Sequence, residues 1–404
     1  MTGTAVVRRR SRPSRTAAPT GPTGSVPPPR EVTPVPLPTP PPTPPTPPVQ
    51  PVAPSGPATR PKRRGLGARL AAGACAVACA VAVSTLFAPT PAVGRPVREA
   101  GVALERVGNF GANPGNLTMY VYRPAHLAPR PAVVVALHGC TQSAQVYADN
   151  SGLTTLADRH GFLVVFAETT TANNLNRCFN WFQPLDNQRG QGEAASIRQM
   201  VAHADSAYGG DPSRTYVTGL SAGGAMTSVM LATYPEVFQA GAVIAGLPYN
   251  CTKDTGPFTC MSPGVDRTPA DWAKRVRDAF PSYTGPWPRV AVWHGDQDPT
   301  VAPKNADELR DQWTAVHGLD QTPDRTSTIG PDRTRREEYL AGDGSVAVQV
   351  NKVPGIGHGT PVDPGTGPEQ CGRTGTANFI QSICSSYWIA DFFGLGGPSA
   401  RSGR

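Results

Sequence analysis

The pentapeptide Gly219-Leu-Ser-Ala-Gly223 constrains the fold of this chain more tightly than any other stretch. It follows a short apolar run at 215–218 and leads into residues 221–234, which have helical spacing. A strand that turns directly into a helix brings backbone segments too close for a Cβ, which accounts for a glycine two positions on either side of Ser221. The strained turn lifts the Ser221 hydroxyl into the open, so this serine is the candidate nucleophile.

Short apolar runs alternate with helical patterns from about residue 97 to residue 388, which is typical of an α/β sheet. Runs that are apolar on both faces suit a central, mostly parallel sheet covered by helices on both faces. Together with the serine turn, this pattern predicts an α/β-hydrolase fold. The expected strands are one or two within 102–122 and single ones at 132–137, 162–166, 215–218, 242–245, 290–293 and 346–353. The expected helices are 193–208, 221–234, 305–316 and 377–393.

The serine needs a base, because a serine hydroxyl is a weak nucleophile near neutral pH. In this fold an acid and then a histidine follow the serine in the chain, and only His294, His317 and His358 lie downstream of it. His358 stands in a glycine-rich loop directly after the expected strand 346–353, where it can swing over the serine. We therefore expect His358 to be the base, His317 to be a solvated helix cap and His294 to be structural.

Two aspartates compete for the role of the acid, because the strand 290–293 is followed by His-Gly-Asp296-Gln-Asp298-Pro. A spacing of two positions puts both side chains on the same side of an extended chain. We favour Asp298 and keep Asp296 as the alternative. The acid holds the His358 tautomer and stabilises its imidazolium, so the other aspartate should be a surface or turn-capping residue.

The loop His138-Gly-Cys-Thr-Gln142 follows the expected strand 132–137. In this fold such a loop supplies one half of an oxyanion hole, and the residue after the nucleophile supplies the other. We predict the backbone N–H groups of Cys140 and Ala222 as the two donors. The alternative is an ordinary strand-to-helix turn.

The net positive charge of the chain comes from its first 69 residues, which hold eleven Lys or Arg and one acid. This stretch carries +10, so the formal +8 of the whole chain leaves about −2 for the remainder. The charge therefore gives no reason to expect a nucleic-acid partner. Residues 25–61 are dominated by proline, and we expect 1–65 to be a disordered basic leader.

An uncharged apolar run at 70–88 follows this leader and is itself followed by small residues and proline. That order is typical of a secretory signal, so we expect residues 66–94 to direct export. Either translation starts nearer Arg60 and the segment is cleaved around Ala92, or the run, close to the roughly 20 residues that span a bilayer, stays as a signal anchor. In both cases the catalytic domain, expected at 95–395 with a flexible tail at 396–404, lies outside the cell. The chain would meet a membrane only through this apolar segment.

Six cysteines lie after the apolar run, and we expect them to form disulfides. The chain has no Cys-x-x-Cys and no nearby His pair, so neither a metal site nor a cofactor is expected. Sequence alone leaves the pairing open. The favoured pairing uses two short loops, Cys251 with Cys260 and Cys371 with Cys384, which leaves Cys140 with Cys178.

Six stretches of the chain together form a specific combination of motifs. They are LHGCTQ (137–142), CFNWF (178–182), RGQGEAASIRQM (189–200), GLSAGGAM (219–226), WHGDQDPTV (293–301) and GIGHGTPVDPG (355–365). In this combination the chain resembles the extracellular polyhydroxybutyrate depolymerase and esterase family, which is related to feruloyl and acetylxylan esterases, over about residues 97–393. The resemblance implies a secreted carboxylic ester hydrolase with Ser221 as nucleophile, Asp298 as acid and His358 as base. Polymer depolymerases of this family usually carry a separate polymer-binding domain, and the short Gly/Ser/Arg tail here weakens a crystalline polyester as the expected substrate.

Three functions remain open at this point. The first is hydrolysis of hydroxyalkanoate oligomers or similar short aliphatic esters, and the second is a feruloyl or acetylxylan esterase acting on acylated plant polysaccharide. The third is a non-catalytic surface binding protein, against which the intact serine, aspartate and histidine argue. Trp181 is a weak candidate for substrate binding because its ring offers flat apolar area, with core packing as the alternative.

Overall fold

The computed structural model describes residues 101–396. The predicted leader, the signal or anchor segment at 66–94 and the tail after residue 396 lie outside these residues, so the predicted domain boundaries remain predictions. Within the described range, every helix is too short or too polar to cross a membrane.

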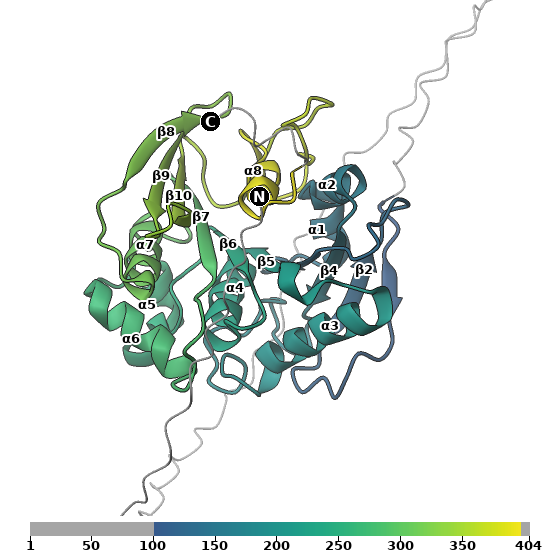
Figure 1. The fold of residues 1–404 in the computed structure, drawn as a ribbon, viewed down its shortest axis with the longest axis horizontal. Coiled ribbons are helices and arrows are strands. Elements are labelled where there is room, and N and C mark those ends of the chain that lie inside the picture. The colour runs from purple at the N-terminus through teal and green to yellow at the C-terminus, as the bar shows by residue number, and fades with distance from the viewer. Residues whose placement is uncertain (1–100, 397–404) are drawn as a thin grey trace, which may run out of the picture. The chain divides into compact units, whose positions relative to one another are not determined.

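A ten-stranded sheet runs through the middle of residues 101–396 (Figure 1), with the strand order β1-β2-β4-β3-β5-β6-β7-β10-β9-β8. The six strands from β4 to β10 in this order are parallel, and antiparallel strands extend both edges. The strands are β1 Glu105–Val107, β2 Thr118–Tyr122, β3 Val133–Leu137, β4 Leu163–Glu168, β5 Thr215–Leu220, β6 Ala240–Ile244, β7 Arg289–Gly295, β8 Arg325–Ile329, β9 Thr334–Leu340 and β10 Val346–Val353. A second sheet pairs β11 Thr360–Val362 with β12 Phe379–Gln381.

Helices cover both faces of the large sheet, as the apolar runs predict. The helices are α1 Ala144–Asn150, α2 Leu153–His160, α3 Gly192–Tyr208, α4 Ala222–Thr233, α5 Pro257–Met261, α6 Pro269–Ala279, α7 Lys304–His317 and α8 Ser385–Phe392, with 3-10 turns at Pro212–Arg214 and Cys251–Asp254. Val133 and Val135 of β3 pack in the core shared with α3, α4, α6 and α7, whereas Val134 and Ala136 pack in the core shared with α1, α2 and α8. Successive side chains of a strand point to opposite faces, so β3 contributes to two separate cores.

The expected helix at 377–393 is wrong in its first part, where the chain instead forms β12 and a turn before α8 begins at Ser385. Asn378 adopts φ +68°, which a right-handed helix does not allow, and its carbonyl accepts the N–H of Thr360. The pairing of β12 with β11 therefore overrides the helical spacing of the apolar residues. The other expected strands and helices are present, with ends that differ by a few residues.

Candidate active site

Ser221 stands between β5 and α4 on the strained turn that the pentapeptide predicts. Its backbone has φ +57° and ψ −117°, and its side chain remains 8% exposed. A Cβ on Gly219 would lie 2.4 Å from the carbonyl oxygen of Gly223, and one on Gly223 would lie 2.2 Å from that of Leu137. Both glycines are therefore required by close backbone contacts around the serine.

His358 follows β10 and connects Ser221 with Asp298. Its Nε2 lies 2.8 Å from the Ser221 Oγ, and its Nδ1 lies 2.7 Å from the Asp298 Oδ2. An ionised carboxylate only accepts hydrogen bonds, so Nδ1 carries the proton and Nε2 is free to accept the serine hydroxyl. The arrangement can take a proton from Ser221 and stabilise the charge that results.

Asp298, rather than Asp296, lies beside the histidine. Its Oδ1 accepts the backbone N–H groups of Thr300 and Val301, at 2.8 and 2.9 Å. Burial acts to raise the pKa of Asp298, but hydrogen bonds from His294, His358 and the Val301 N–H, together with the His358 charge, hold that pKa well below its usual range. The carboxylate is therefore ionised throughout the neutral range.

Asp296 is exposed and accepts the Gly355 N–H at 2.7 Å, so it caps a turn, the place expected for the unused aspartate. His294 is buried, with its Nε2 2.9 Å from the Val301 carbonyl oxygen and 3.4 Å from the Asp298 Oδ2. It packs the loop of the acid, as expected of a structural residue. His317 ends α7 and contacts the Pro288 carbonyl oxygen, where it is partly buried rather than fully solvated.

The acid and the base come from neighbouring strands. Strands β7 and β10 pair in parallel, with Gly295 opposite Val353 at their carboxyl ends. Asp298 lies three positions beyond one strand and His358 five positions beyond the other. The pairing of these strands therefore sets the distance between the carboxylate and the imidazole.

Residues 138–142, which we call the oxyanion loop, follow β3 and lie against the Ser221 turn. A Cβ on Gly223 would also lie 2.6 Å from the His138 carbonyl oxygen, so the loop and the start of α4 are in direct backbone contact. The structure records no hydrogen bond from the N–H of Cys140 or of Ala222 to any residue within 101–396. Neither predicted donor is thus engaged by another described residue.

A second segment, residues 176–178, is bonded to the oxyanion loop. The disulfide of Cys140 with Cys178 joins the two, the Thr141 N–H donates to the Asn176 carbonyl oxygen at 2.7 Å, and the Arg177 guanidinium donates to the Thr141 carbonyl oxygen at 2.5 Å. The structure pairs the other cysteines as the sequence favours, Cys251 with Cys260 and Cys371 with Cys384.

Glu193, within the RGQGEAASIRQM stretch, is a buried carboxyl for which the sequence indicates no role. It accepts the backbone N–H and the side-chain amide of Asn180, at 2.7 and 3.2 Å, and so holds the segment that contains Cys178. Burial raises its pKa to about 8, although the hydrogen bonds from Asn180 lower it in part. Its helical position at the start of α3 gave no sign of this role, because the partner lies in another segment.

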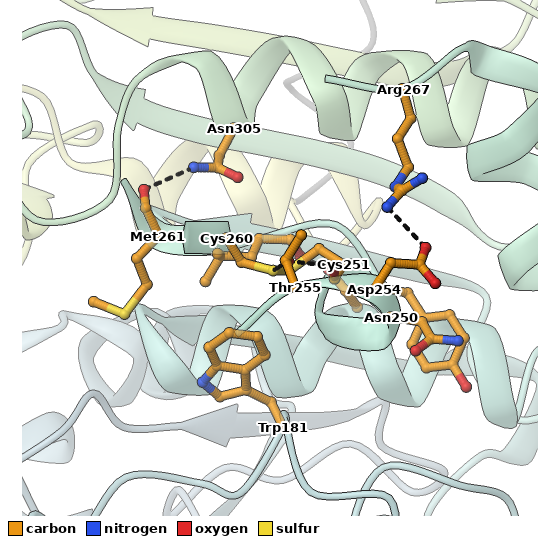
Figure 2. The surroundings of a disulfide bond; sticks show 12 residues. Trp181, Asn250, Cys251, Asp254, Thr255, Cys260, Met261, Arg267 and Asn305 are labelled. Carbon is orange, nitrogen blue, oxygen red and sulfur yellow. Dashed lines mark hydrogen bonds and ion pairs between the residues drawn. A yellow bond between two sulfur atoms is a disulfide. The ribbon is translucent and has the colours of Figure 1, made fainter. Parts of the chain in front are cut away.

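Trp181 is 7% exposed and belongs to the core. Figure 2 shows its indole beside the Cys251–Cys260 disulfide, with the Met261 side chain nearby. The Phe182 ring meets it edge-on at 5.5 Å between ring centres. This position favours the packing alternative for Trp181 over substrate binding.

A mostly parallel sheet with a serine on a strand-to-helix turn, hydrogen-bonded through a histidine to an aspartate, defines an α/β-hydrolase. The profile of the family described as Esterase PHB depolymerase matches residues 116–338. Poly(3-hydroxyalkanoate) depolymerase C of Paucimonas lemoignei is 51% identical over 296 residues, which are 72% of this chain and 70% of that protein. The chain belongs to this esterase family and is a carboxylic ester hydrolase.

Two further relatives are named for other ester substrates. Feruloyl esterase B of Talaromyces stipitatus is 37% identical over 281 residues, which are 68% of this chain and 76% of that protein. The solved structure of the acetyl xylan esterase from Aspergillus awamori covers 73% of this chain and 100% of its own, with a TM-score of 0.62 and 31% identity.

Proposed function

We propose that this protein is a secreted serine esterase that hydrolyses short aliphatic esters, with hydroxyalkanoate oligomers as its substrate class. The observation that carries the proposal is the unbroken hydrogen-bond series from Asp298 through His358 to Ser221. The name and 51% identity of the Paucimonas depolymerase support the acyl class. Export rests on the apolar run at 70–88, with a retained signal anchor as the alternative.

In the proposed mechanism the Ser221 Oγ attacks the ester carbonyl carbon while its proton passes to the His358 Nε2. The tetrahedral intermediate collapses, the carbon–oxygen bond to the alcohol breaks, and the alcohol leaves with the proton from His358. A water molecule then attacks the carbonyl carbon of the acyl-enzyme and gives a proton to the same nitrogen. The bond between that carbon and the Ser221 Oγ breaks, Oγ takes the proton back from His358, and the acid is released. Asp298 accepts the Nδ1–H throughout and stabilises the imidazolium.

The negative charge on the carbonyl oxygen needs donors that are already in place. We assign the N–H groups of Cys140 and Ala222 to this role, because neither is used elsewhere within 101–396. Ala222 follows Ser221 directly, and the loop of Cys140 contacts the Ser221 turn at Gly223. The second of these groups also stands at the first position of α4, where unpaired N–H groups favour negative charge.

A polar hollow beside the oxyanion loop suits a substrate with acceptors beyond the ester that is cleaved. It has a volume of about 460 Å³. Its lining residues are Thr141, Glu168, Thr169, Thr170, Thr171, Leu175, Asn176 and Arg177. Hydroxyl and guanidinium donors here can bind the next ester of an oligomer or the sugar hydroxyls of an acylated polysaccharide. The acylated polysaccharide is the second candidate substrate, because a feruloyl esterase and an acetyl xylan esterase are among the relatives.

The test compares the purified chain with Ser221→Ala on p-nitrophenyl acetate to octanoate, on a hydroxybutyrate oligomer, on acetylated xylan and on methyl ferulate. We expect short-chain activity that falls at least about 10⁴-fold in the variant, since a nucleophile of this type carries most of the rate. A higher kcat/KM on the oligomer than on the other two natural esters supports the substrate class. A folded wild-type protein without activity would overturn the proposal in favour of a surface binding protein.

A further inference from the structure

Gln142, the last residue of the oxyanion loop, uses both ends of its side-chain amide in hydrogen bonds. It is 6% exposed. Its Oε1 accepts the Gly139 N–H at 2.9 Å, and its Nε2 donates to the Ala377 carbonyl oxygen at 3.4 Å. Its own backbone N–H donates to the Gly139 carbonyl oxygen at 3.2 Å. The residue therefore holds the peptide groups on both sides of Gly139.

The direction of the Cys140 N–H follows from these contacts. The Gly139 carbonyl and the Cys140 N–H belong to one trans peptide group, so they point in opposite directions. The Gly139 carbonyl accepts the Gln142 N–H and also faces the His138 Nδ1 at 2.8 Å. Once this carbonyl is held, the N–H of Cys140 has a fixed direction too.

His138 can serve as a donor here because its other ring nitrogen accepts the Thr169 N–H at 3.3 Å, which leaves the proton on Nδ1. Burial lowers the pKa of His138 to about 4, so the ring is neutral at the pH of ester hydrolysis. Two donors, one from a side chain and one from the backbone, thus converge on the Gly139 carbonyl oxygen.

The second contact of Gln142 reaches the other half of the site. Ala377 precedes Asn378, whose carbonyl oxygen accepts the Thr360 N–H at 2.8 Å. Thr360 lies two positions after His358, and a Cβ on the intervening Gly359 would lie 2.8 Å from the same Asn378 oxygen. Through Ala377, Gln142 therefore connects the oxyanion loop to the loop of the base.

We propose that Gln142 is a positioning residue for ester hydrolysis, which aims the Cys140 N–H at the developing oxyanion and couples that donor to the His358 loop. This inference rests on the function proposed above. Gln142 touches neither the ester nor Ser221, so it acts on the transition state through the peptide group of Gly139 and Cys140.

The test uses Gln142→Met, which keeps the length of the side chain but removes both polar contacts, and Gln142→Glu, which keeps an oxygen for the Gly139 N–H. We expect kcat on p-nitrophenyl acetate to fall about 10- to 100-fold in the Met variant with KM within about twofold, because loss of one whole oxyanion donor costs about 10²- to 10³-fold. The Glu variant should recover about tenfold of that loss. Affinity for a trifluoromethyl ketone, whose serine adduct places an oxyanion in the hole, should fall in parallel with kcat.

Gln145→Met is the matched control, because Gln145 lies three positions away on α1 and its amide binds Val102 and Asp149 at the surface. It should leave kcat and ketone affinity unchanged. The inference is overturned if Gln142→Met keeps wild-type kcat, or if kcat falls while ketone affinity does not. If the Met variant fails to fold, the Glu variant is tested instead. In that variant any change in kcat must be matched by the same change in ketone affinity. An inactive wild-type protein, or full activity in Ser221→Ala, would instead mean that the proposed function has failed.

Discussion

The two sides of the active site are held in different ways. On one side, Ser221 is fixed by backbone contacts within β5, α4 and the end of β3, where two glycines leave no room for a Cβ. On the other side, His358 stands in a loop whose neighbours are the small β11–β12 sheet and the Cys371–Cys384 disulfide. The nucleophile thus depends on close backbone packing, whereas the base depends on the pairing of short loop segments.

The sharpest way to break this contrast is to add one methyl group on each side. In Gly223→Ala the new Cβ meets the Leu137 carbonyl oxygen at 2.2 Å, so we expect a loss of at least about 3 kcal/mol in the free energy of unfolding and loss of esterase activity. In Gly357→Ala the nearest atoms are 3.7 Å away, and stability should change by less than about 1 kcal/mol. Urea denaturation and p-nitrophenyl acetate assays measure both, and equal tolerance at the two positions would contradict the contrast.

The second prediction concerns the acid on the histidine side. Asp298→Asn replaces the acceptor of the His358 Nδ1–H and should lower kcat about 10³- to 10⁴-fold, because the imidazole is then held in the wrong tautomer. Asp296→Asn is the matched control two positions away, and it should retain kcat within about threefold, since that carboxylate only accepts the Gly355 N–H. Similar losses in both variants would show that the loop rather than the carboxylate is what matters.

The third prediction distinguishes local unfolding near His358 from global unfolding of the protein. Cys371→Ser with Cys384→Ser opens a loop of 13 residues and should cost about 3 kcal/mol of unfolding free energy. Activity should be lost at a lower temperature than the global unfolding transition, because this loop holds β11 just after His358. Cys251→Ser with Cys260→Ser opens a loop of 9 residues away from the base, and there the two transitions should coincide. Circular dichroism and residual activity against temperature report the two events.

The smallest expected effect is on the pH dependence of stability. The pKa of Asp298 in the folded protein lies below its value of about 4 in the unfolded chain, so the stability it contributes is complete above that pH and is lost as pH falls through the folded pKa. The difference in unfolding free energy between wild type and Asp298→Asn should therefore stay constant from pH 6 to about 5 and shrink below about 4. Denaturation curves at each pH measure it, and a difference that grows on acidification would show the opposite sign of the pKa shift.

Most of the parallel sheet, and the meeting of Ser221, His358 and Asp298, could be predicted because their signals are local. The turn at Ser221 shows its glycines and its strand-to-helix setting within one short stretch, and Asp298 and His358 each follow a recognisable strand. The role of Gln142 could not be predicted, since its contact with Ala377 joins residues 235 positions apart. The strand β12 was missed for a related reason, because its partner β11 and the left-handed Asn378 decide its conformation.

The apolar pattern does not predict strands β8 and β9. Most residues of β8 are exposed, and β9 carries four charged residues in succession, so neither shows the apolar run of a buried strand. Their place in the sheet comes from antiparallel pairing, of β9 with β10 and of β8 with β9.

Because β7 pairs with β10, the distance between the acid and the base in the molecule does not depend on the number of residues between them in the sequence. Asp298 and His358 are 60 positions apart, and the chain between them makes α7 and the β8–β9 hairpin before it returns. After β9, the turn at 341–345 that leads into β10 is mostly exposed, and a Cβ on Gly342 or Gly344 would meet no atom within 4 Å. An additional domain inserted in this exposed turn would leave the carboxylate and the imidazole in place, so the turn is a suitable fusion point for modules that bring the enzyme to a chosen substrate.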